Sequence, residues 1–503
     1  MRAFRSSAFW FWAVTAVAAY YWAVSTFIGL DDAYIYFRIA GNLCETGRPV
    51  FNPGDAGFIA TSPLWVILLA AGKWVVPILD FVLLAKGLTL LCLVLAAWFA
   101  YRLFHPRLPV GAVFLAAPFL LSHALAGMAG GEIALLIAAF MGALWAVSEE
   151  RPGWMGIFIG VGILARGEFI LILPPALAVA VWTARARGEA WKRLSIRMGI
   201  TVGIAAGLAL LGLAWMAWTF GDPLPHTLAV KRMQGLSGKW PLYPQEIWDS
   251  VRRVLPGWRV CLLPFAALGA MAFPRAAATM AAFTGLHALA YAVMTIPAYG
   301  WYYYDFVLFT PLLVFLGLAK AAEWMSDWAA RRTTARPPFR RIMDGRRVGA
   351  HAFLLAGLAW MVPMHPGLLH PRFASNAWSA EAPGERFRSY REAARRILAE
   401  AKPGDAVLTN EIGILSYFLK GVEIRDNNGL ASPIITTQTM NCWECVVDRY
   451  RPRFIVFPVR VEDDEKVFSF NGTLHRYRHR FIANPAAVHY AASVYEREDG
   501  LGP

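Results

Sequence analysis

Two adjacent acidic residues, Asp31 and Asp32, directly follow the first long apolar run of this 503-residue chain. Apolar residues recur at helical spacing from Ala33 to Cys44, so we expect 33–45 to form an amphipathic interfacial helix with both acids at its N-terminus. Carboxylates in that place can cap the helix, hold a metal ion or accept a proton as a general base. The residue types alone leave these three roles open.

Three further charged residues interrupt apolar sequence. Glu132 ends the small-residue turn Gly127-Met128-Ala129-Gly130-Gly131, and Arg166-Gly167-Glu168 divides a longer apolar stretch. A charge between apolar helices is costly and is expected to face a polar cavity. The alternatives are purely structural roles: Glu132 caps a helix, and Arg166 and Glu168 only neutralise each other.

A pair of cations, Lys231 and Arg232, ends the segment Phe220-Gly221-Asp222-Pro223-Leu224-Pro225-His226-Thr227-Leu228-Ala229-Val230. Lysine offers a point charge and arginine a fork of donors, a combination that suits a phosphate group. The alternative is that both side chains reach lipid headgroups without any further role.

Aromatic residues form a last group of candidates. They precede Asp305 and comprise Tyr299, Trp301, Tyr302, Tyr303 and Tyr304. An aromatic belt at a membrane surface explains such a cluster, and so does stacking against a sugar.

The elements that position these residues must lie in a membrane. Hydrophobic residues make up 57% of the chain and charged residues only 16%, against roughly 25% charged in soluble domains. Soluble, disordered, collagen-like and disulfide-scaffold classes are therefore excluded. Residues 1–366 hold 30 Lys and Arg against 17 Asp and Glu, whereas 367–503 hold 18 against 17. The basic excess lies in short loops, which indicates a role in membrane topology rather than nucleic-acid binding.

We predict eleven membrane spans. Nine runs have spanning length, namely 8–30, 80–101, 109–127, 131–148, 197–219, 257–273, 276–297, 303–320 and 349–364. Two shorter runs flank Arg166-Gly167-Glu168 and give helices of only about 18 and 22 Å, so we expect both to lie in a water-filled vestibule.

Residues 62–79 decide the orientation. Gly72 and Lys73 interrupt this run, and counting it as a span would place the basic loops 184–197 and 320–348 outside. We therefore interpret 62–79 as interfacial. The prediction is a multi-pass protein of the bacterial plasma membrane with its N-terminus in the cytoplasm, and all the candidate residues then fall on the outer face.

The chain is predicted to have two domains. Residues 1–366 form the transmembrane domain, with a first outer loop over 31–79, and residues 373–503 form a small soluble α/β domain outside the membrane. Its expected elements are a helix over 384–401, strands at 406–409 and 453–458, and helices near 411–420 and 436–450 that flank the segment E-I-R-D at 423–426, an alternation that resembles a small βαβ layer. No glycine-rich phosphate loop follows its first strand, so we expect no nucleotide site there. Cys442 and Cys445 form either a disulfide or an idle pair of thiols.

Several motifs carry a resemblance to a known family. The stretch D-D-A-Y-I-Y-F-R at 31–38 with T-S-P-L-W at 61–65, the G-D-P-L-P-H-T-L-A-V-K segment at 221–231, and the turns ending in Glu132 and Glu168 resemble the GT-C superfamily of membrane glycosyltransferases. The branch that looks closest includes the mycobacterial terminal arabinofuranosyltransferase. His226 and Gly167 stand where that branch has Asn and Pro. A weaker similarity to the family lies in R-D-N-N-G-L at 425–430.

This resemblance implies a GT-C-like fold and a function. The enzyme would move a sugar, such as arabinofuranose or another pentose or hexose, from a polyprenyl-phosphate donor to a cell-envelope glycan or lipid acceptor on the outer face. Asp31 would be the general base, and Asp32 would orient it or help it bind a divalent cation (Mg, Mn or Ca), although no cofactor is certain. The donor phosphate would contact Lys231, Arg232, Arg166 and His226. The sugar or acceptor pocket would contain Glu132, Glu168, Tyr34, Tyr302 and Tyr303.

A transporter is the alternative function. A lipid-linked-sugar flippase or small-molecule carrier would also have many spans, broken helices and charges within the membrane. Carriers usually contain internal repeats, and this sequence has no second copy of the Asp-Asp loop or of the Arg-Gly-Glu turn. The comparison favours the transferase.

Overall fold

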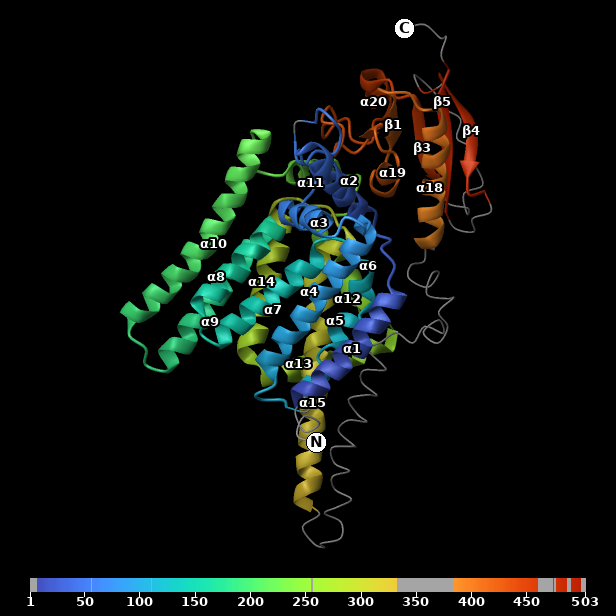
Figure 1. The fold of residues 1–503 in the computed structure, drawn as a ribbon. Helices are drawn as coiled ribbons and strands as arrows, with labels where there is room; N and C mark the ends of the chain where they lie inside the picture. Colours follow the sequence, from blue (N-terminus) through green and yellow to red (C-terminus); the bar gives the residue numbers. More distant parts are fainter. Residues whose placement is uncertain are drawn as a thin grey trace.

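The protein is a helical bundle that carries a small α/β domain at one end (Figure 1). The computed structural model describes residues 7–55, 57–109, 111–254, 257–332, 383–459, 474, 476–485 and 490–498. We call the end of the bundle formed by α2, α3 and α11 the upper end, and the opposite end the lower end. The α/β domain lies beside the upper end (Figure 1).

Six described helical segments are long and apolar enough to cross a membrane. They are α1 (Ser7–Ser25), α4 (Phe81–Phe104), η3 with α9 (Gly167–Ala186), α10 (Trp191–Phe220), α14 (Pro274–Val293) and η6 with the first part of α15 (Gly300–Met325). The chain is thus a multi-pass membrane protein. Five further apolar segments are shorter, namely Pro63–Val75, Gly111–Gly127, Ile133–Ser148, Pro152–Ala165 and Val260–Ala272. These lengths do not confirm the predicted count of eleven spans. Two other predictions, the span 349–364 and the boundary between the domains, lie outside the described residues.

The prediction of two short half-helices around the Arg-Gly-Glu turn is wrong in one half. Helix α8 (Pro152–Ala165) is short, but the 3-10 helix η3 (Gly167–Ile172) continues directly into α9 (Leu173–Ala186). Together η3 and α9 comprise 20 residues, enough to span a bilayer core of about 30 Å. The apolar run 169–183 is shorter than the helical segment because the 3-10 helix begins at Gly167 and α9 continues to Ala186.

The upper end is built from helices too short to cross a membrane. Helix α2 (Asp31–Thr46) matches the predicted amphipathic helix, with both acids in its first turn. Helix α3 (Pro63–Val75) has proline in its first turn and is capped by Ser62, whose hydroxyl accepts from the Trp65 N–H at 3.1 Å. Its 13 residues give about 20 Å of helix, as the interfacial interpretation of 62–79 requires. Helix α11 (His226–Leu236) follows the C-terminus of α10.

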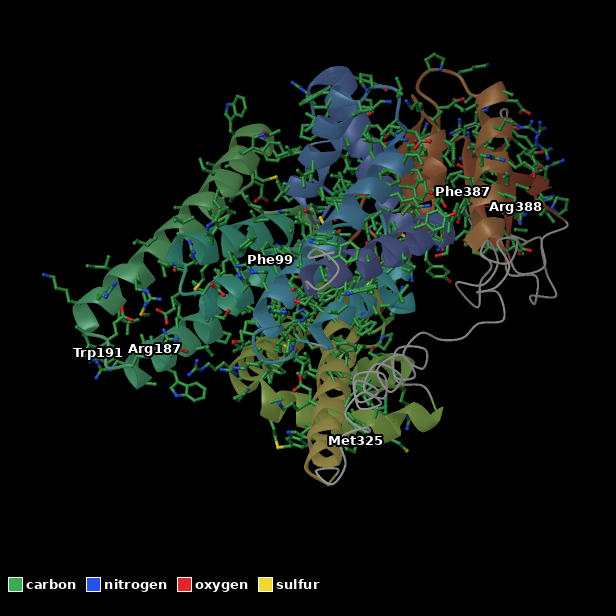
Figure 2. All side chains as sticks on the ribbon, turned by 60° about the horizontal axis from the view of Figure 1, so that its bottom comes forward. Phe99, Arg187, Trp191, Met325, Phe387 and Arg388 are labelled. Atoms are coloured by element: carbon green, nitrogen blue, oxygen red, sulfur yellow. A yellow bond between two sulfur atoms is a disulfide. The ribbon has the colours of Figure 1, made fainter. Side chains whose placement is uncertain are left out.

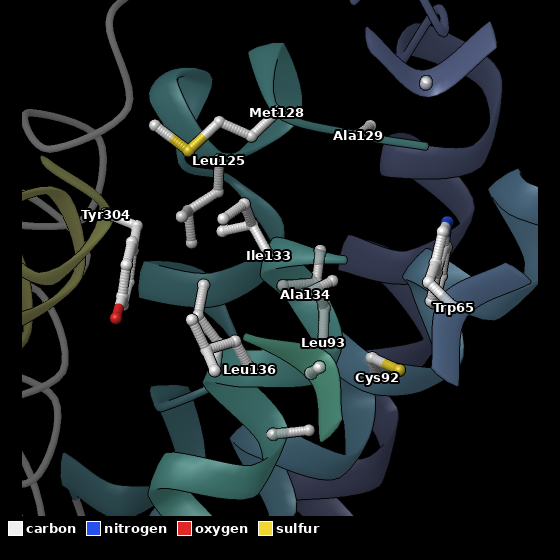
Figure 3. Packing of buried hydrophobic residues seen from close by; sticks show 14 of the residues in the cluster. Trp65, Cys92, Leu93, Leu125, Met128, Ala129, Ile133, Ala134, Leu136 and Tyr304 are labelled. Carbon is white, nitrogen blue, oxygen red and sulfur yellow. The ribbon is translucent and has the colours of Figure 1, made fainter. Parts of the chain in front are cut away.

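Below this end the bundle packs through large apolar side chains. Figure 3 shows Trp65, Leu93 and Ile133 among the buried residues of this region. The Trp65 indole donates to the Gly130 carbonyl at 2.9 Å. Gly130 has a φ of 93°, and a Cβ there would lie 2.5 Å from Ile28, so only glycine fits this turn. The turn fixes the start of α7 (Ile133–Ser148) and with it Glu132.

The remaining described helices of the bundle connect these segments. They are η2 (Gly111–Phe114), α5 (Ala117–Leu120), α6 (His123–Gly127), η4 (Tyr243–Glu246), α12 (Ile247–Val254), η5 (Gly257–Leu262), α13 (Leu263–Ala272), η6 (Gly300–Tyr303) and α15 (Tyr304–Arg332). Pro311 lies inside α15.

The C-terminal domain is a five-stranded sheet in the order β2-β1-β3-β5-β4. The two predicted strands are present as β1 (Ala406–Thr409) and β3 (Phe454–Val459), the segment E-I-R-D forms β2 (Glu423–Asp426), and the three strands run parallel. Strands β4 (Tyr477–Ala483) and β5 (Ala491–Arg497) were not predicted, and they add an antiparallel edge. The helices are α18 (Pro383–Glu400), α19 (Gly413–Phe418) and α20 (Trp443–Tyr450). Cys442 and Cys445 form a disulfide, which settles the alternative that the sequence left open.

The C-terminal domain faces the bundle with the edge of its sheet at which the parallel strands end. Strand β1 has β2 on one side and β3 on the other, which makes it the switch point of the parallel sheet. Loops at the carboxyl ends of parallel strands are the usual binding edge of such a sheet. Helix α19 follows β1 and packs against α2, and one continuous hydrophobic core runs from the bundle into the domain.

Candidate functional site

Asp31 joins the two domains. Its carboxylate oxygens accept hydrogen bonds from the Gly413 and Ile414 N–H groups, both at 2.8 Å, at the start of α19. A Cβ on Gly413 would lie 1.9 Å from the Asp31 carbonyl oxygen, so glycine is required for this approach. Burial raises the pKa of Asp31 to about 6, even though Arg386 opposes the shift. The carboxylate is therefore held in a fixed orientation and binds a proton more readily than an ordinary aspartate.

Asp32 faces a different set of groups. It is half-buried, and burial raises its pKa against the opposing charges of Lys231, Arg386 and Arg166. Tyr36 lies one helical turn further along α2 and hydrogen-bonds Glu132. The first turn of α2 thus directs one acid to the C-terminal domain and the other to the bundle.

Arg166 is the centre of a buried ion-pair cluster. Its guanidinium donates to Glu132 at 2.7 Å, forms a second ion pair with Glu168, and donates to the Tyr291 hydroxyl at 3.2 Å. Tyr291 donates in turn to Glu168 at 3.0 Å. The ring of Tyr302 lies 5.2 Å from the Arg166 guanidinium carbon. Two carboxylates around one guanidinium leave this cluster with an excess of negative charge.

Lys231 has few anionic partners. Its ammonium lies 3.9 Å from the centre of the Tyr299 ring and donates to the Gln234 amide oxygen at 3.2 Å. Burial alone would lower its pKa, but Tyr299, Tyr302 and Asp32 outweigh burial and the pKa is raised. An ammonium group has three donors, and those not directed at Gln234 can bind an anion.

Three of the sequence-predicted residues do not join these groups. Arg232 is exposed on α11, because the next residue of a helix points about 100° away from Lys231. Tyr34 is fully buried, donates to the Ile28 carbonyl at 2.8 Å and packs against Tyr417 of the C-terminal domain. Tyr303 is buried as well and donates to the Tyr243 carbonyl at 2.6 Å. Both hydroxyls thus donate to backbone carbonyls instead of to the groups around Arg166, and the assignment of Tyr34 and Tyr303 to the pocket stays a prediction.

His226 lies beside the C-terminal domain instead of beside Arg166. Its Nε2 atom is 3.3 Å from the Gly429 carbonyl oxygen. It lines a cavity of about 230 Å³ between the loop at 55–59, the α10–α11 connection and residues 430–433. This cavity is mostly apolar, with Asp55 and Asp222 at its wall.

The C-terminal domain contributes groups that sequence reasoning missed. Arg386 forms a two-pronged ion pair with Glu411, with N–O distances of 2.6 and 2.9 Å, next to Asp31. The loop after β2 is closed by Asp426, which accepts from the Ala431 N–H at 2.7 Å and from two other N–H groups. Lys231 acts on the pKa of Asp426, which places this loop near the cation.

A signal for some missed residues was present in the sequence. Tyr36 is four residues after Asp32, and Gln234 is three residues after Lys231, so each shares a helix face with its partner. Tyr291, Arg386 and the Asp426 loop are distant in sequence from the acids, and no local pattern connects them.

The two acids do not make a chelating pair. Both oxygens of Asp31 accept backbone N–H groups, while Asp32 faces Lys231 and Arg166. Within the described part of the chain, no three His, Cys, Asp or Glu side chains come together as metal ligands. The described residues therefore show no ligand cluster for the divalent cation, which stays a possibility raised by the sequence.

The arrangement can support displacement at a carbon that carries a phosphate. Asp31 is a candidate proton acceptor, Lys231 is a candidate anion-binding group, and the cluster around Arg166 offers hydrogen-bond donors and acceptors suited to a polyhydroxylated ligand. All lie at the upper end of the bundle. The upper end therefore combines an acid, a cation and aromatic rings.

The chain is similar to one curated protein in sequence and to solved structures in fold. No family model matches the chain. It is 33% identical over 189 residues to the terminal beta-(1->2)-arabinofuranosyltransferase of Mycobacterium tuberculosis, covering 32% of this chain and 29% of that protein. The chain thus aligns with less than a third of the length of this relative. The resemblance drawn from the motifs is confirmed over that part.

The fold matches a solved membrane protein over nearly its whole length. The apo structure of ArnT from Cupriavidus metallidurans superposes with a TM-score of 0.58 at 14% identity, covering 96% of this chain and 97% of that one. The structure of the same protein bound to undecaprenyl phosphate gives a TM-score of 0.49, also at 14% identity. The predicted fold, a GT-C-like helical membrane domain with a small C-terminal α/β domain, is confirmed.

Proposed function

We propose that this protein is a membrane glycosyltransferase that moves a sugar from a polyprenyl-phosphate donor to a hydroxyl of a cell-envelope glycan or lipid. The observation that carries the proposal is that Asp32 faces Lys231 and the Arg166 cluster at one end of an ArnT-like bundle, with Asp31 beside it in the first turn of α2. The curated relative is an arabinofuranosyltransferase, so arabinofuranose is the first sugar to test.

Asp31 is the general base of this proposal. Its pKa of about 6 brings its basicity close to neutral pH, where a general base is most effective. The two N–H groups of α19 orient it, and each carboxylate oxygen keeps a second lone pair for an acceptor hydroxyl. Asp32 supplies a carboxylate that faces the positive charges of Lys231 and Arg166. No step is assigned to a metal ion.

Lys231 binds the donor phosphate. Arg166 is already neutralised by Glu132 and Glu168, whereas Lys231 has Gln234 and aromatic rings as its nearest partners. A phosphodiester placed beside Lys231 gains charge-assisted hydrogen bonds. The sugar that it carries then lies between Lys231 and Asp31, where Glu132, Glu168 and Tyr302 can contact its hydroxyls.

The upper end faces away from the cytoplasm in this proposal. The lower end carries the exposed basic residues of the α9–α10 connection, Arg185, Arg187, Lys192 and Arg193. Basic loops stay in the cytoplasm, so the C-terminal domain is extracytoplasmic. In a background without the free cysteines Cys44, Cys92 and Cys261, Arg388→Cys should react with an impermeant thiol reagent added to whole cells and Arg193→Cys should not; the reverse pattern would invert the topology.

Turnover in proteoliposomes tests the chemistry. Purified protein is mixed with a radiolabelled polyprenyl-phosphate-arabinofuranose and an oligosaccharide acceptor, and labelled product and free polyprenyl phosphate are measured. Asp31→Asn should lower turnover by about 100-fold or more while the protein remains folded. Lys231→Gln should raise the donor KM by about 10- to 100-fold, from the loss of 1.5–3 kcal/mol for a charge-assisted hydrogen bond.

Controls on the same helices make the test specific. Arg232→Gln removes a charge from the exposed side of α11 and should leave turnover unchanged. Full activity in Asp31→Asn together with loss in Asp32→Asn would transfer the base role to Asp32. Movement of intact donor across the membrane with no sugar transfer would instead identify a carrier.

A further inference from the structure

A basic cavity lies at the lower end of the bundle, far from the proposed active site. It has a volume of about 230 Å³ and is bounded by the ends of α4, α7 and α9 and the start of α14. Four arginines from separate elements line it, namely Arg102, Arg107, Arg187 and Arg275, and Glu149 is the one acidic residue in its wall. The proposed transferase reaction uses none of these residues.

Exposed tryptophans place this cavity at the level of the membrane surface. Trp182 is 53% exposed and Trp191 is 61% exposed, as expected for an aromatic belt. The Arg275 guanidinium lies 5.8 Å from the Trp182 ring centre, and Arg185 lies 4.6 Å from that of Trp191. Arg187 and Trp191 lie together in Figure 2, well away from Phe387 and Arg388 of the C-terminal domain. A ligand in the cavity would therefore sit at headgroup depth.

The charges in the cavity are only partly neutralised. Arg187 forms an ion pair with Glu150, and Arg102 stacks beside the rings of Trp98 and Trp145. Arg107 is exposed and has no ion pair with any residue of the described ranges. The positive-inside rule explains why basic residues lie near the lower end. It does not explain why four arginines line the same cavity.

Thr183 adds a hydroxyl group to the cavity. It is only 6% exposed and lines the same cavity as the four arginines. A hydroxyl can donate a hydrogen bond to a phosphate oxygen that the guanidinium groups hold. The rest of the wall includes Phe104, Val147, Val179 and Phe273, which offers apolar contact beside the charges.

We propose that this cavity binds a phosphate group, supplied by an anionic phospholipid of the leaflet at the lower end. Guanidinium forks match phosphate oxygens, Thr183 can donate to one of them, and the apolar wall can receive the glycerol backbone. Basic pockets between membrane helices commonly bind anionic lipid headgroups. The proposal depends on the lower end alone, so it stands or fails independently of the transferase activity.

Native mass spectrometry of the full chain in detergent tests this site. The protein is titrated with short-chain phosphatidylglycerol, with phosphatidylcholine of the same chain length, and with inorganic phosphate. We expect one phosphatidylglycerol to bind at least about 10-fold more tightly than phosphatidylcholine. The double variant Arg107→Gln/Arg275→Gln should lower the phosphatidylglycerol affinity by about 10- to 100-fold, as expected for the loss of charged hydrogen bonds.

Two further variants separate specific binding from general charge effects. Lys192→Gln removes a cation from the same end of the protein but outside the cavity, and its affinity should equal that of the unaltered chain. Arg107→Gln alone changes an exposed side chain, so it folds even if the double variant does not, and it should lower affinity by several-fold. Equal affinity for the two lipids, or an equal loss in Lys192→Gln, would overturn the proposal. Binding of inorganic phosphate without phosphatidylglycerol would overturn the lipid as source and assign the site to a soluble phosphate.

Discussion

Gly413→Ala should separate the C-terminal domain from the acids of α2. A methyl group at this position would lie 1.9 Å from the Asp31 carbonyl oxygen and 2.7 Å from its carboxyl carbon. The start of α19 must therefore retreat by about 1.5 Å to reach ordinary contact distance. Hydrogen bonds now 2.8 Å long to the Gly413 and Ile414 N–H groups would then exceed 4 Å and be lost. At about 1.5–3 kcal/mol for each bond to a charged group, the docking weakens by roughly 3–6 kcal/mol.

Hydrogen exchange and turnover measure the two consequences of this change. Amides of α2 and α19 should exchange faster in Gly413→Ala, while those of β3 and β5 keep their protection. Turnover should fall because Asp31 loses its fixed orientation. The control is Gly285→Ala in α14, where an added methyl meets no atom within 4 Å and neither quantity should change. Unchanged exchange and full turnover in Gly413→Ala would refute the role of these two hydrogen bonds.

Three more predictions follow from the charges of the site. Replacing Arg166 by Gln leaves Glu132 and Glu168 buried without their partner, so thermal unfolding should show a loss of about 3–5 kcal/mol, and adding Glu168→Gln should restore part of it. Turnover should fall about tenfold for each pH unit below about 6, because protonated Asp31 cannot accept a proton. Measurements of kcat/KM from pH 4.5 to 8 should show this decrease. A midpoint far from pH 6 would argue against Asp31 as the base. Treatment with EDTA should leave turnover unchanged, since Asp31 and Asp32 address different partners, and reactivation of a chelated sample by Mn²⁺ would contradict this.

Local patterns in the sequence predicted the positions of individual elements well. The 3.6-residue spacing after Asp32 predicted α2, and short β-rich runs predicted β1 and β3, because these signals depend only on neighbouring residues. Strands β4 and β5 were missed. Their sequences, YRHRFIA and AASVYER, mix charged and apolar residues without a clear alternation.

The partners of the site residues could not be predicted in the same way. The sequence predicted Glu132, Arg166 and Glu168 on one side of the membrane. That they form one cluster with Tyr291 depends on the packing of three separate segments. Likewise the two N–H groups that bind Asp31 lie 382 and 383 residues away, at the start of α19, whose position depends on the whole sheet. Tyr34 and Tyr303 were assigned to the pocket by residue type, and only packing determines that their hydroxyls bind backbone carbonyls.

The charges of the site suggest how Asp31 and Lys231 cooperate in the proposed reaction. As the acceptor hydroxyl attacks, its proton passes to Asp31, which loses its negative charge, while the departing phosphodiester becomes a monoester and gains one. Negative charge therefore moves from the side of the C-terminal domain toward Lys231, whose partners Gln234 and Tyr299 leave donors free to receive it. Lys231 then stabilises the transition state more than the bound donor, so its loss should lower kcat as well as raise the donor KM. Because the N–H groups of α19 hold Asp31 at the start of this charge movement, the C-terminal domain is part of the site and not an appendage to it.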